Sequence, residues 1–282
     1  MMRDIPSVCI MIPTYNQANY IIKAVESALA QDYPNKEIVI ADDHSTDNTE
    51  EILKPVISNP IIKYTKNTSN LGRVANYKNC LYAHTTADWV INLDGDDYYT
   101  NSHFISQAIH AIQTSGLDQT LFYQGVNIIK SDTEEKIIVP NINSDEEWIS
   151  SKDYFLKYFE RNYFSHMSTL YNRQLAIKSN FYKNNVLSTD IFSFLSLCLN
   201  FDEKKVIVSK NISGVWLQHD NNISKTLHLK EHWDNFGLYI KLYKLAIENE
   251  YCKLQSFKWL MKACYNYLKG YISKSIEIFK AN

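Results

Sequence analysis

The first hundred residues alternate short apolar runs with amphipathic stretches. Four apolar runs, at residues 8–12, 37–41, 61–64 and 89–93, predict strands. Such continuous runs are typical of strands that are buried on both faces of a parallel sheet. Between them, apolar residues recur every three or four positions, which predicts helices. The predicted helices are residues 21–29, a short turn around 51–53, and 73–83. This alternation predicts an α/β fold.

The pattern from residue 101 to about 225 is mixed. Helices are predicted at 104–112, 152–160 and 191–199, the last opened by Asp190. Residues 121–129 and 136–139 flank a polar turn and predict a hairpin. Further strands are predicted at 167–171, 206–209 and 214–217. This half therefore combines strands and helices without a strict order.

From about His228 the pattern is helical throughout. Residues 225–282 carry ten lysines and five acidic residues, a net charge of +5, together with many aromatic side chains. We predict a domain at residues 1–225, with a nucleotide-binding part at about 1–100 and an acceptor-binding part at about 101–225. A helical extension at 226–282 follows. The extension either rests on an anionic membrane or packs on the domain or on a second copy in a homodimer. We favour packing, because its aromatic residues can fill a core.

Composition excludes several classes of protein. The chain has 282 residues, of which 45% are hydrophobic and 21% charged, so it can form a proper core. The net charge of −2 argues against a nucleic-acid partner held by overall positive charge. Five dispersed cysteines without a C-x-x-C spacing favour reduced thiols in a cytoplasmic protein, and Cys9 and Cys198 are expected in the core. With no signal core and no long apolar stretch evident, we expect a protein that does not cross a membrane.

The strongest candidate for chemistry is the acidic stretch Asp94-Gly95-Asp96-Asp97, directly after a predicted strand. Carboxylates this close repel one another unless a cation or hydrogen-bond donors hold them. Hard oxygen ligands suit Mg²⁺ or Mn²⁺, which are commonly shared with substrate phosphates. The motif alone leaves a solvated turn equally open. Tyr15, Asp43 and Asp96 all follow predicted strand ends, where parallel sheets bind ligands.

Four stretches in order resemble a known family. They are VCIMIPTYN (residues 8–16), ADDHSTD (41–47), NLGR (70–73) and LDGDD (93–97). They resemble family 2 glycosyltransferases over roughly residues 7–225. The resemblance implies the GT-A fold, a Rossmann-like and mostly parallel sheet flanked by helices, here with the C-terminal helical extension.

The same resemblance implies a nucleotide site. Tyr15 would stack on the base, Asp43 would accept a hydrogen bond from it, and Pro13 would shape the pocket. Arg73 would lie near the base or the diphosphate, and Asp94 would contact the ribose or a metal-bound water. The alternatives are a surface aromatic for Tyr15, a helix cap for Asp43 and a solvated charge for Arg73.

The resemblance also implies metal and catalytic residues. Asp96 would bind the Mn²⁺ or Mg²⁺ that bridges the diphosphate, and Asp97 would orient that site or bind the metal itself. His219 would join the metal or the diphosphate. Asp190 would be the base that deprotonates the acceptor hydroxyl, with a helix N-cap as its alternative. His166 would lie on the acceptor side, with a structural histidine as its alternative.

This chain departs from the family pattern at three places. Thr189 stands where the family usually has a Glu before the base. The stretch before His219 lacks the frequent Arg, and His44 replaces a commoner Gly.

We therefore predict an inverting, metal-dependent, non-processive glycosyltransferase. It would move a sugar from a nucleotide sugar, expected to be a UDP-sugar, to a glycan or lipid-linked glycan in bacterial surface polysaccharide synthesis. The processive Gln-x-x-Arg-Trp motif is absent. The expected location is cytoplasmic, with possible peripheral contact at the inner face of the cell membrane. A sugar nucleotidyltransferase and a non-catalytic nucleotide-sugar or glycan-binding protein are the alternatives.

Overall fold

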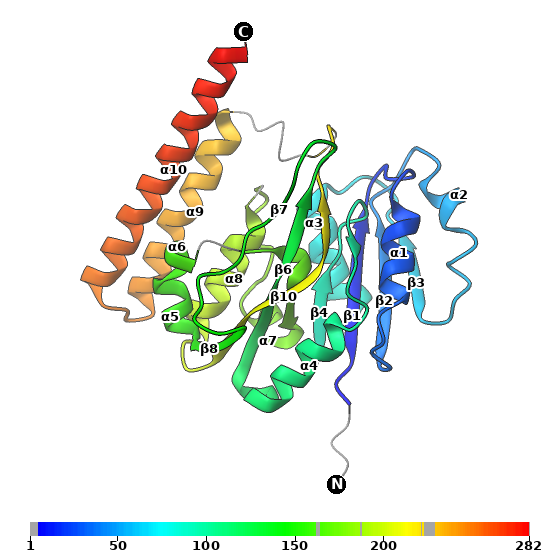
Figure 1. Cartoon of the computed structure of the whole chain (residues 1–282), viewed down its shortest axis with the longest axis horizontal. Coiled ribbons are helices and arrows are strands. Elements are labelled where there is room, and N and C mark those ends of the chain that lie inside the picture. Colours follow the sequence, from blue (N-terminus) through cyan, green and yellow to red (C-terminus); the bar gives the residue numbers. More distant parts are fainter. Residues whose placement is uncertain (1–4, 162–163, 187, 221, 223–228, 282) are drawn as a thin grey trace.

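A computed structural model describes residues 5–161, 164–186, 188–220, 222 and 229–281 (Figure 1). The described residues form a ten-stranded mixed sheet with helices on both faces. The main strand order is β3-β2-β1-β4-β9-β6-β10-β5; β7 pairs with β6, and β8 pairs with β10. The α/β prediction is confirmed.

The first half of the sheet is parallel, as predicted. Strand β1 pairs in parallel with β2 and β4, and β2 pairs in parallel with β3. Its strands are β1 (Val8–Thr14), β2 (Lys36–Asp42), β3 (Ile62–Lys66) and β4 (Trp89–Asn92). Its helices are α1 (Ile21–Leu29), α2 (Thr49–Leu53), α3 (Arg73–Asn79) and a π-helical turn (Cys80–His84).

The second half of the sheet is mixed. Its strands are β5 (Tyr98–Tyr99), β6 (Thr120–Lys130), β7 (Glu135–Ile137), β8 (Glu146–Ser150), β9 (Thr169–Asn172) and β10 (Lys205–Leu217). The predicted hairpin is confirmed, because β6 and β7 pair antiparallel. The prediction of separate strands at 206–209 and 214–217 is wrong. They are one strand, since register shifts on either side of Ile212 absorb the residues between them.

The helices of the second half cover both faces of the sheet. They are α4 (Phe104–Ser115), α5 (Ser151–Leu156), α6 (Tyr158–Arg161), α7 (Arg173–Lys178), α8 (Thr189–Asn200), α9 (Leu229–Glu248) and α10 (Lys253–Ala281), with 3-10 turns at Leu117–Gln119 and His166–Ser168. The second of these turns occupies the start of the strand predicted at 167–171.

Two hydrophobic clusters, one on each face of the sheet, hold these layers together. In β1, Val8, Ile10 and Ile12 point to the cluster under α1 and α4, whereas Cys9 and Met11 point to the other. This alternation follows from the period of two in a strand. Both sides of β1 are buried, which is the reason its sequence is a continuous apolar run.

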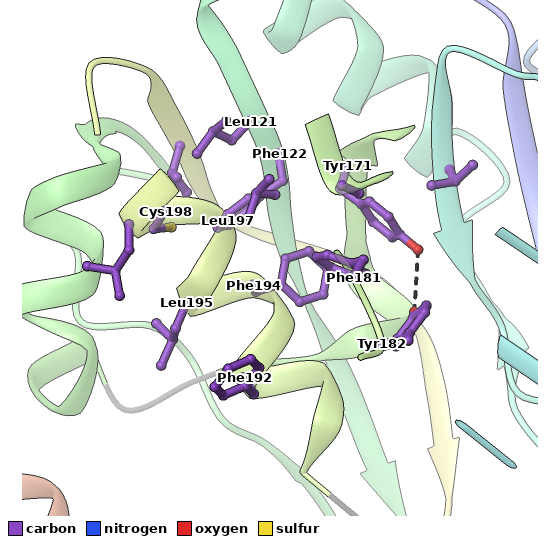
Figure 2. Packing of buried hydrophobic residues seen from close by; sticks show 14 of the residues in the cluster. Leu121, Phe122, Tyr171, Phe181, Tyr182, Phe192, Phe194, Leu195, Leu197 and Cys198 are labelled. Carbon is purple, nitrogen blue, oxygen red and sulfur yellow. Dashed lines mark hydrogen bonds between the residues drawn. The ribbon is translucent and has the colours of Figure 1, made fainter. Parts of the chain in front are cut away.

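Helix α8 lies at the centre of the other cluster, to which Cys9 and Met11 of β1 point (Figure 2). Phe194 packs edge-on against Phe122, Tyr171 and Phe181, with ring centroids 4.9–5.3 Å apart. Edge-to-face aromatic pairs contribute about 0.5–1.5 kcal/mol each beyond their buried area. Cys9 and Cys198 are buried, which confirms their predicted core positions.

The C-terminal helices pack on this same cluster. Trp259 of α10 stacks on Phe155 of α5 with ring centroids 4.5 Å apart, and Leu238 and Leu242 of α9 are buried beside it. Helix α9 also binds the start of α8, because Asn235 Oδ1 accepts the backbone N–H of Ser188 at 3.0 Å. The predicted packing of these helices on the preceding domain is therefore confirmed. Within the described part of the chain, no helix combines the length and the apolar content needed to cross a bilayer.

Candidate active site

A cavity of about 560 Å³ opens at the carboxyl ends of β1, β2 and β4. Parallel strands that carry helices on both faces present their ligand sites at this edge. Seven of the ten residues predicted from the sequence line the cavity: Pro13, Tyr15, Asp43, Arg73, Asp94, Asp96 and His219. The other three, Asp97, His166 and Asp190, do not line it.

Asp43 anchors the polar loop that forms one wall of the cavity. Its buried carboxylate accepts the backbone N–H groups of Leu71 at 2.8 Å and Gly72 at 2.9 Å, and the side-chain amide of Asn67 at 2.9 Å. Gly72 has a φ of +86°, a conformation that a glycine adopts without strain. A carboxylate accepts about four hydrogen bonds, so Asp43 can take one more from a ligand. The N-cap residue of α2 is Asn48, so Asp43 does not cap that helix.

Tyr15 stands at the mouth of the cavity with 46% of its surface exposed. The next residue, Asn16, fixes the loop after β1 to the loop after β2. Its side-chain oxygen accepts the backbone N–H of Thr46 at 2.8 Å, and its own N–H donates to Ser45 Oγ at 3.0 Å. A positive φ of 52° at Asn16 turns the chain there. The tyrosine ring is thus held beside the cavity and remains open to a planar ligand.

The three aspartates of the acidic stretch have different surroundings. Asp94 accepts a hydrogen bond of 2.5 Å from Tyr77 Oη, and burial raises its pKa. Asp97 is buried and accepts the backbone N–H of Leu217 at 2.9 Å, so it fastens the acidic loop to the end of β10. Burial, followed by the charges of Asp96 and Asp94, raises the pKa of Asp97 well above its ordinary value.

Asp96 meets His219, although 123 residues separate them in the sequence. Asp96 Oδ2 lies 2.9 Å from His219 Nε2, and the side-chain amide of Asn222 donates to the same oxygen at 3.3 Å. The imidazole stacks on Tyr20 with ring centroids 4.6 Å apart. Its Nδ1 is buried and has no hydrogen-bond partner among the described residues.

These side chains fit a divalent cation that is shared with a ligand. Among the described residues, no group of three or more His, Cys, Asp or Glu side chains is arranged to hold a metal by itself. Mg²⁺ and Mn²⁺ sites at phosphates commonly use only one or two protein carboxylates and take the remaining oxygens from the substrate. Asp96 supplies such a carboxylate, and the imidazole of His219 lies beside it.

Asp190 is the second residue of α8, and Ser188 is its N-cap, so Asp190 is not the capping residue. Its Oδ1 accepts the backbone N–H of Ile191 at 2.9 Å. Burial raises the pKa of Asp190, and the positive charge of Arg73 opposes that rise. Arg73 also interacts with Asp94 and Tyr77, so its guanidinium group stabilises the carboxylates of both Asp94 and Asp190. The alternative of a solvated charge for Arg73 does not fit these contacts.

His166 lies behind the cavity. Its Nε2 is 2.7 Å from Tyr182 Oη, and Tyr182 Oη in turn donates to Asn92 Oδ1 at 3.1 Å. Tyr182 Oη also lies 3.4 Å from Tyr171 Oη, the contact drawn in Figure 2. Its ring is 5.6 Å from that of Tyr77, centroid to centroid. Burial lowers the pKa of His166 to about 4, so the imidazole is neutral at physiological pH. It belongs to a buried polar network that adjoins the cavity through Tyr77, and its charged form interacts with Asp94 and Arg73 of the cavity wall.

The other residues that line the cavity include Tyr20, Tyr77, Trp216 and Asn222, which the sequence pattern does not mark as site residues. In the sequence, Tyr77 fits the apolar face of the helix predicted at residues 73–83. Its ring does pack in the core, but its hydroxyl reaches Asp94. Tyr20 stacks on His219, which is far away in the chain, and such a contact produces no pattern in the sequence around either residue.

Comparison with known proteins places this geometry in a family. The pattern described as Glycosyl transferase family 2 matches residues 9–179. The chain is 39% identical over 107 residues to UDP-Glc:alpha-D-GlcNAc-diphosphoundecaprenol beta-1,3-glucosyltransferase WfaP of Escherichia coli, a match that covers 38% of this chain and 41% of that enzyme. The matches to the first curated relatives thus span less than half of those proteins' length.

Two solved structures are similar in fold. S. aureus TarS 1-349 in complex with UDP-GlcNAc superposes with a TM-score of 0.73 at 17% identity, covering 90% of this chain and 70% of that chain. The mannosyltransferase PcManGT from Pyrobaculum calidifontis, in complex with GDP-Man and Mn²⁺, gives a TM-score of 0.58 at 16% identity, covering 95% and 75%. At these identities the likeness concerns the fold.

Proposed function

The chain belongs to glycosyltransferase family 2, and from that premise we propose that it moves a sugar from a UDP-sugar to a hydroxyl group of a glycan or lipid-linked glycan. The transfer is a single inverting, non-processive displacement that uses one divalent cation. The observation that carries the proposal is the meeting of Asp43, Asp96 and His219 around one cavity, with Asp190 coupled to it through Arg73.

Asp43 and Tyr15 bind the base in this proposal. The carboxylate of Asp43 has one acceptor position beyond its three internal hydrogen bonds, and the N3–H of a uracil ring is a matching donor. Tyr15 offers an exposed ring on which the base stacks. A uridine nucleotide is favoured because one relative is named for UDP-Glc and one similar structure contains UDP-GlcNAc.

Asp96 and His219 would hold the cation beside the diphosphate of the donor. When bound, such a cation neutralises the negative charge that builds on the departing diphosphate. Tyr20 keeps the imidazole in place by stacking, and Asn222 orients the carboxylate of Asp96. A similar structure that contains Mn²⁺ supports this choice of metal.

Asp190 acts as the base. The acceptor oxygen attacks the anomeric carbon of the donor sugar and transfers its proton to the carboxylate of Asp190. The bond from that carbon to the diphosphate oxygen breaks in the same step, which inverts the anomeric configuration. The raised pKa of Asp190 makes it a stronger base than a solvated aspartate, while the positive charge of Arg73 favours its ionised form.

Calorimetry and a transfer assay test the proposal. UDP is expected to bind more tightly with Mn²⁺ than without it, and Asp96→Ala removes that difference because the cation loses its carboxylate. Asp190→Asn is expected to bind UDP normally and to lower transfer, or slow hydrolysis of the UDP-sugar, by about 10²-fold or more. Asp132→Asn, in the exposed turn between β6 and β7, is the control and should change neither.

The same measurements separate the two alternatives. A non-catalytic binding protein would bind UDP yet show no turnover that depends on Asp190. A sugar nucleotidyltransferase would form a nucleotide sugar from a nucleoside triphosphate and a sugar phosphate. The end of β1 and the loop after it carry Pro13 to Asn16 in place of the glycine-rich basic loop which that chemistry needs.

A further inference from the structure

Helix α10 has two apolar faces, of which the described structure covers only one. The inner face buries Ser256, Trp259 and Ala263 against the domain. The opposite face carries five large apolar side chains at spacings of three, four, four and three residues, each 49–65% exposed: Leu254, Phe257, Met261, Tyr265 and Leu268. We call these five residues the outer stripe. Figure 1 shows α10 on the outside of the molecule, with α9 between it and the sheet.

An exposed stripe of this kind is unusual for a helix whose other side already packs in a core. Single exposed apolar residues are ordinary, but a contiguous row indicates a surface that binds something. At 100° per residue the five positions span less than a quarter of the helix circumference. The stripe is therefore a narrow apolar strip along a rod-shaped edge of the molecule.

The charged residues of α10 that flank the outer stripe are all lysines. Lys258 and Lys269 follow one edge of the stripe and Lys253 the other, by helical geometry. The sequence from Lys253 to Lys269 contains no acidic residue. Lys262, further round the helix, pairs with Glu160 of α6 at 2.9 Å and so belongs to the contact with the domain.

We propose that the outer stripe of α10 lies on an anionic lipid surface. Its apolar side chains enter the boundary between headgroups and acyl chains, and the flanking lysines contact the negative headgroups. Tyr265, the fourth of the five residues, suits this boundary because its ring is apolar and its hydroxyl polar. The contact goes beyond the proposed transfer reaction and is measured without it.

Charge also argues against a second copy of the chain as the occupant. Two copies that met stripe to stripe about a twofold axis would bring the same lysine-flanked surfaces together. The lysines of the two copies would repel one another, and residues 253–269 contain no acidic residue that could compensate this repulsion. An anionic membrane supplies the opposite charge along the whole length of the stripe.

Co-sedimentation with vesicles tests the proposal on the full chain. We expect binding to vesicles of phosphatidylglycerol and phosphatidylcholine that weakens as salt is added, and little binding to phosphatidylcholine alone. Lys258→Gln with Lys269→Gln should weaken the binding by about tenfold or more, since each lysine near such a surface contributes to the affinity. Phe257→Ser with Tyr265→Ser should weaken it to a similar degree.

Matched controls lie at the other end of the sheet. Lys54→Gln with Lys63→Gln removes two exposed lysines, one directly after α2 and one in β3, and Ile52→Ser removes an exposed apolar residue of α2. Circular dichroism of every variant confirms that it is folded. The proposal is overturned if the wild type does not bind anionic vesicles at low salt, or if the controls weaken binding as much. It is also overturned if light scattering shows a dimer that Phe257→Ser with Tyr265→Ser converts to a monomer.

Discussion

Arg73 connects the nucleotide side of the site with the proposed base. Its guanidinium interacts with Asp94, which follows β4, and with Asp190, which begins α8. Burial by itself pushes the pKa of Asp190 upward, because it disfavours the charged carboxylate. The arginine opposes that shift, so its charge controls the fraction of Asp190 that is able to accept a proton.

Replacing Arg73 should therefore change the pH dependence of transfer. In Arg73→Met the pKa of Asp190 rises further, and the acid limb of the kcat/KM profile moves to higher pH. Arg73→Lys keeps the charge and should move the limb less. A loss of activity by the same factor at every pH in both variants would show that Arg73 only binds the donor.

His166 makes stability depend on pH. Its folded-state pKa of about 4 lies below the ordinary value of 6.5, so the folded protein binds fewer protons than the unfolded chain between these values. The free energy of unfolding consequently falls as the pH falls through that range. Urea titrations should show a loss of about 2 kcal/mol from this residue between pH 7 and pH 5.

His166→Gln removes that contribution, so its free energy of unfolding should fall less than that of the wild type over the same interval. The comparison cancels the effects of all other groups. His110→Gln, at an exposed position of α4, is the matched control and should keep the wild-type difference. Equal losses in the wild type and in His166→Gln would contradict the buried neutral histidine.

At the scale of elements, the pair β5–β10 holds the two halves of the candidate metal site together. Strand β5 directly follows the acidic loop, and β10 leads to His219. Gly214 of β10 lies so close to β5 that an added Cβ would come within 2.2 Å of the carbonyl oxygen of Tyr98 and 2.6 Å of Tyr99 Cα. Backbone atoms cannot move aside as the end of a side chain can, so this contact requires glycine.

Gly214→Ala is expected to lower the free energy of unfolding by about 3 kcal/mol and to weaken UDP binding in the presence of Mn²⁺. Gly237→Ala in α9 is the opposite case, because nothing lies within 4 Å of its added Cβ. There the better helix propensity of alanine should stabilise the protein by up to about 1 kcal/mol. Urea denaturation of both variants measures the two effects, and similar effects of the two substitutions would contradict the close contact.

At the scale of the whole molecule, the C-terminal helices share the core of the domain that precedes them. Trp259 is buried on Phe155, and Asn235 binds the turn that begins α8 two residues before Asp190. The sequence-based division at residue 225 therefore separates segments that pack as one body. These helices support the proposed base as well as presenting the outer stripe.

Trp259→Ala should lower the free energy of unfolding of the entire chain by about 3–5 kcal/mol, the usual cost of a large core truncation. Tryptophan fluorescence and circular dichroism should report one common transition. Trp233→Ala, at a side chain that is 59% exposed, should change the stability by less than about 0.5 kcal/mol. An early, separate transition of the helices in Trp259→Ala would mean that they form an independent unit.

The sequence by itself determined the alternation of strands and helices and the polar residues that follow each strand. Both follow from local rules: a doubly buried strand must be apolar along its length, and parallel strands bring their carboxyl ends to one edge. For this reason the pattern of the chain is enough to indicate Tyr15, Asp43 and Asp96 as residues of one site. The motif resemblance added His219 and Asp190 by position in the chain.

Only the tertiary structure decided which side chains act together. The meeting of Asp96 with His219 depends on the register of β10 against β5 and β6, which is set by packing across more than a hundred residues. Tyr77 and His166 look like an ordinary core aromatic and a lone histidine until the buried network joins them. The helical pattern of α10 predicted a helix with apolar residues, but which of its faces meets the core and which meets solvent depends on contacts far away in the chain, and local periodicity does not record those contacts.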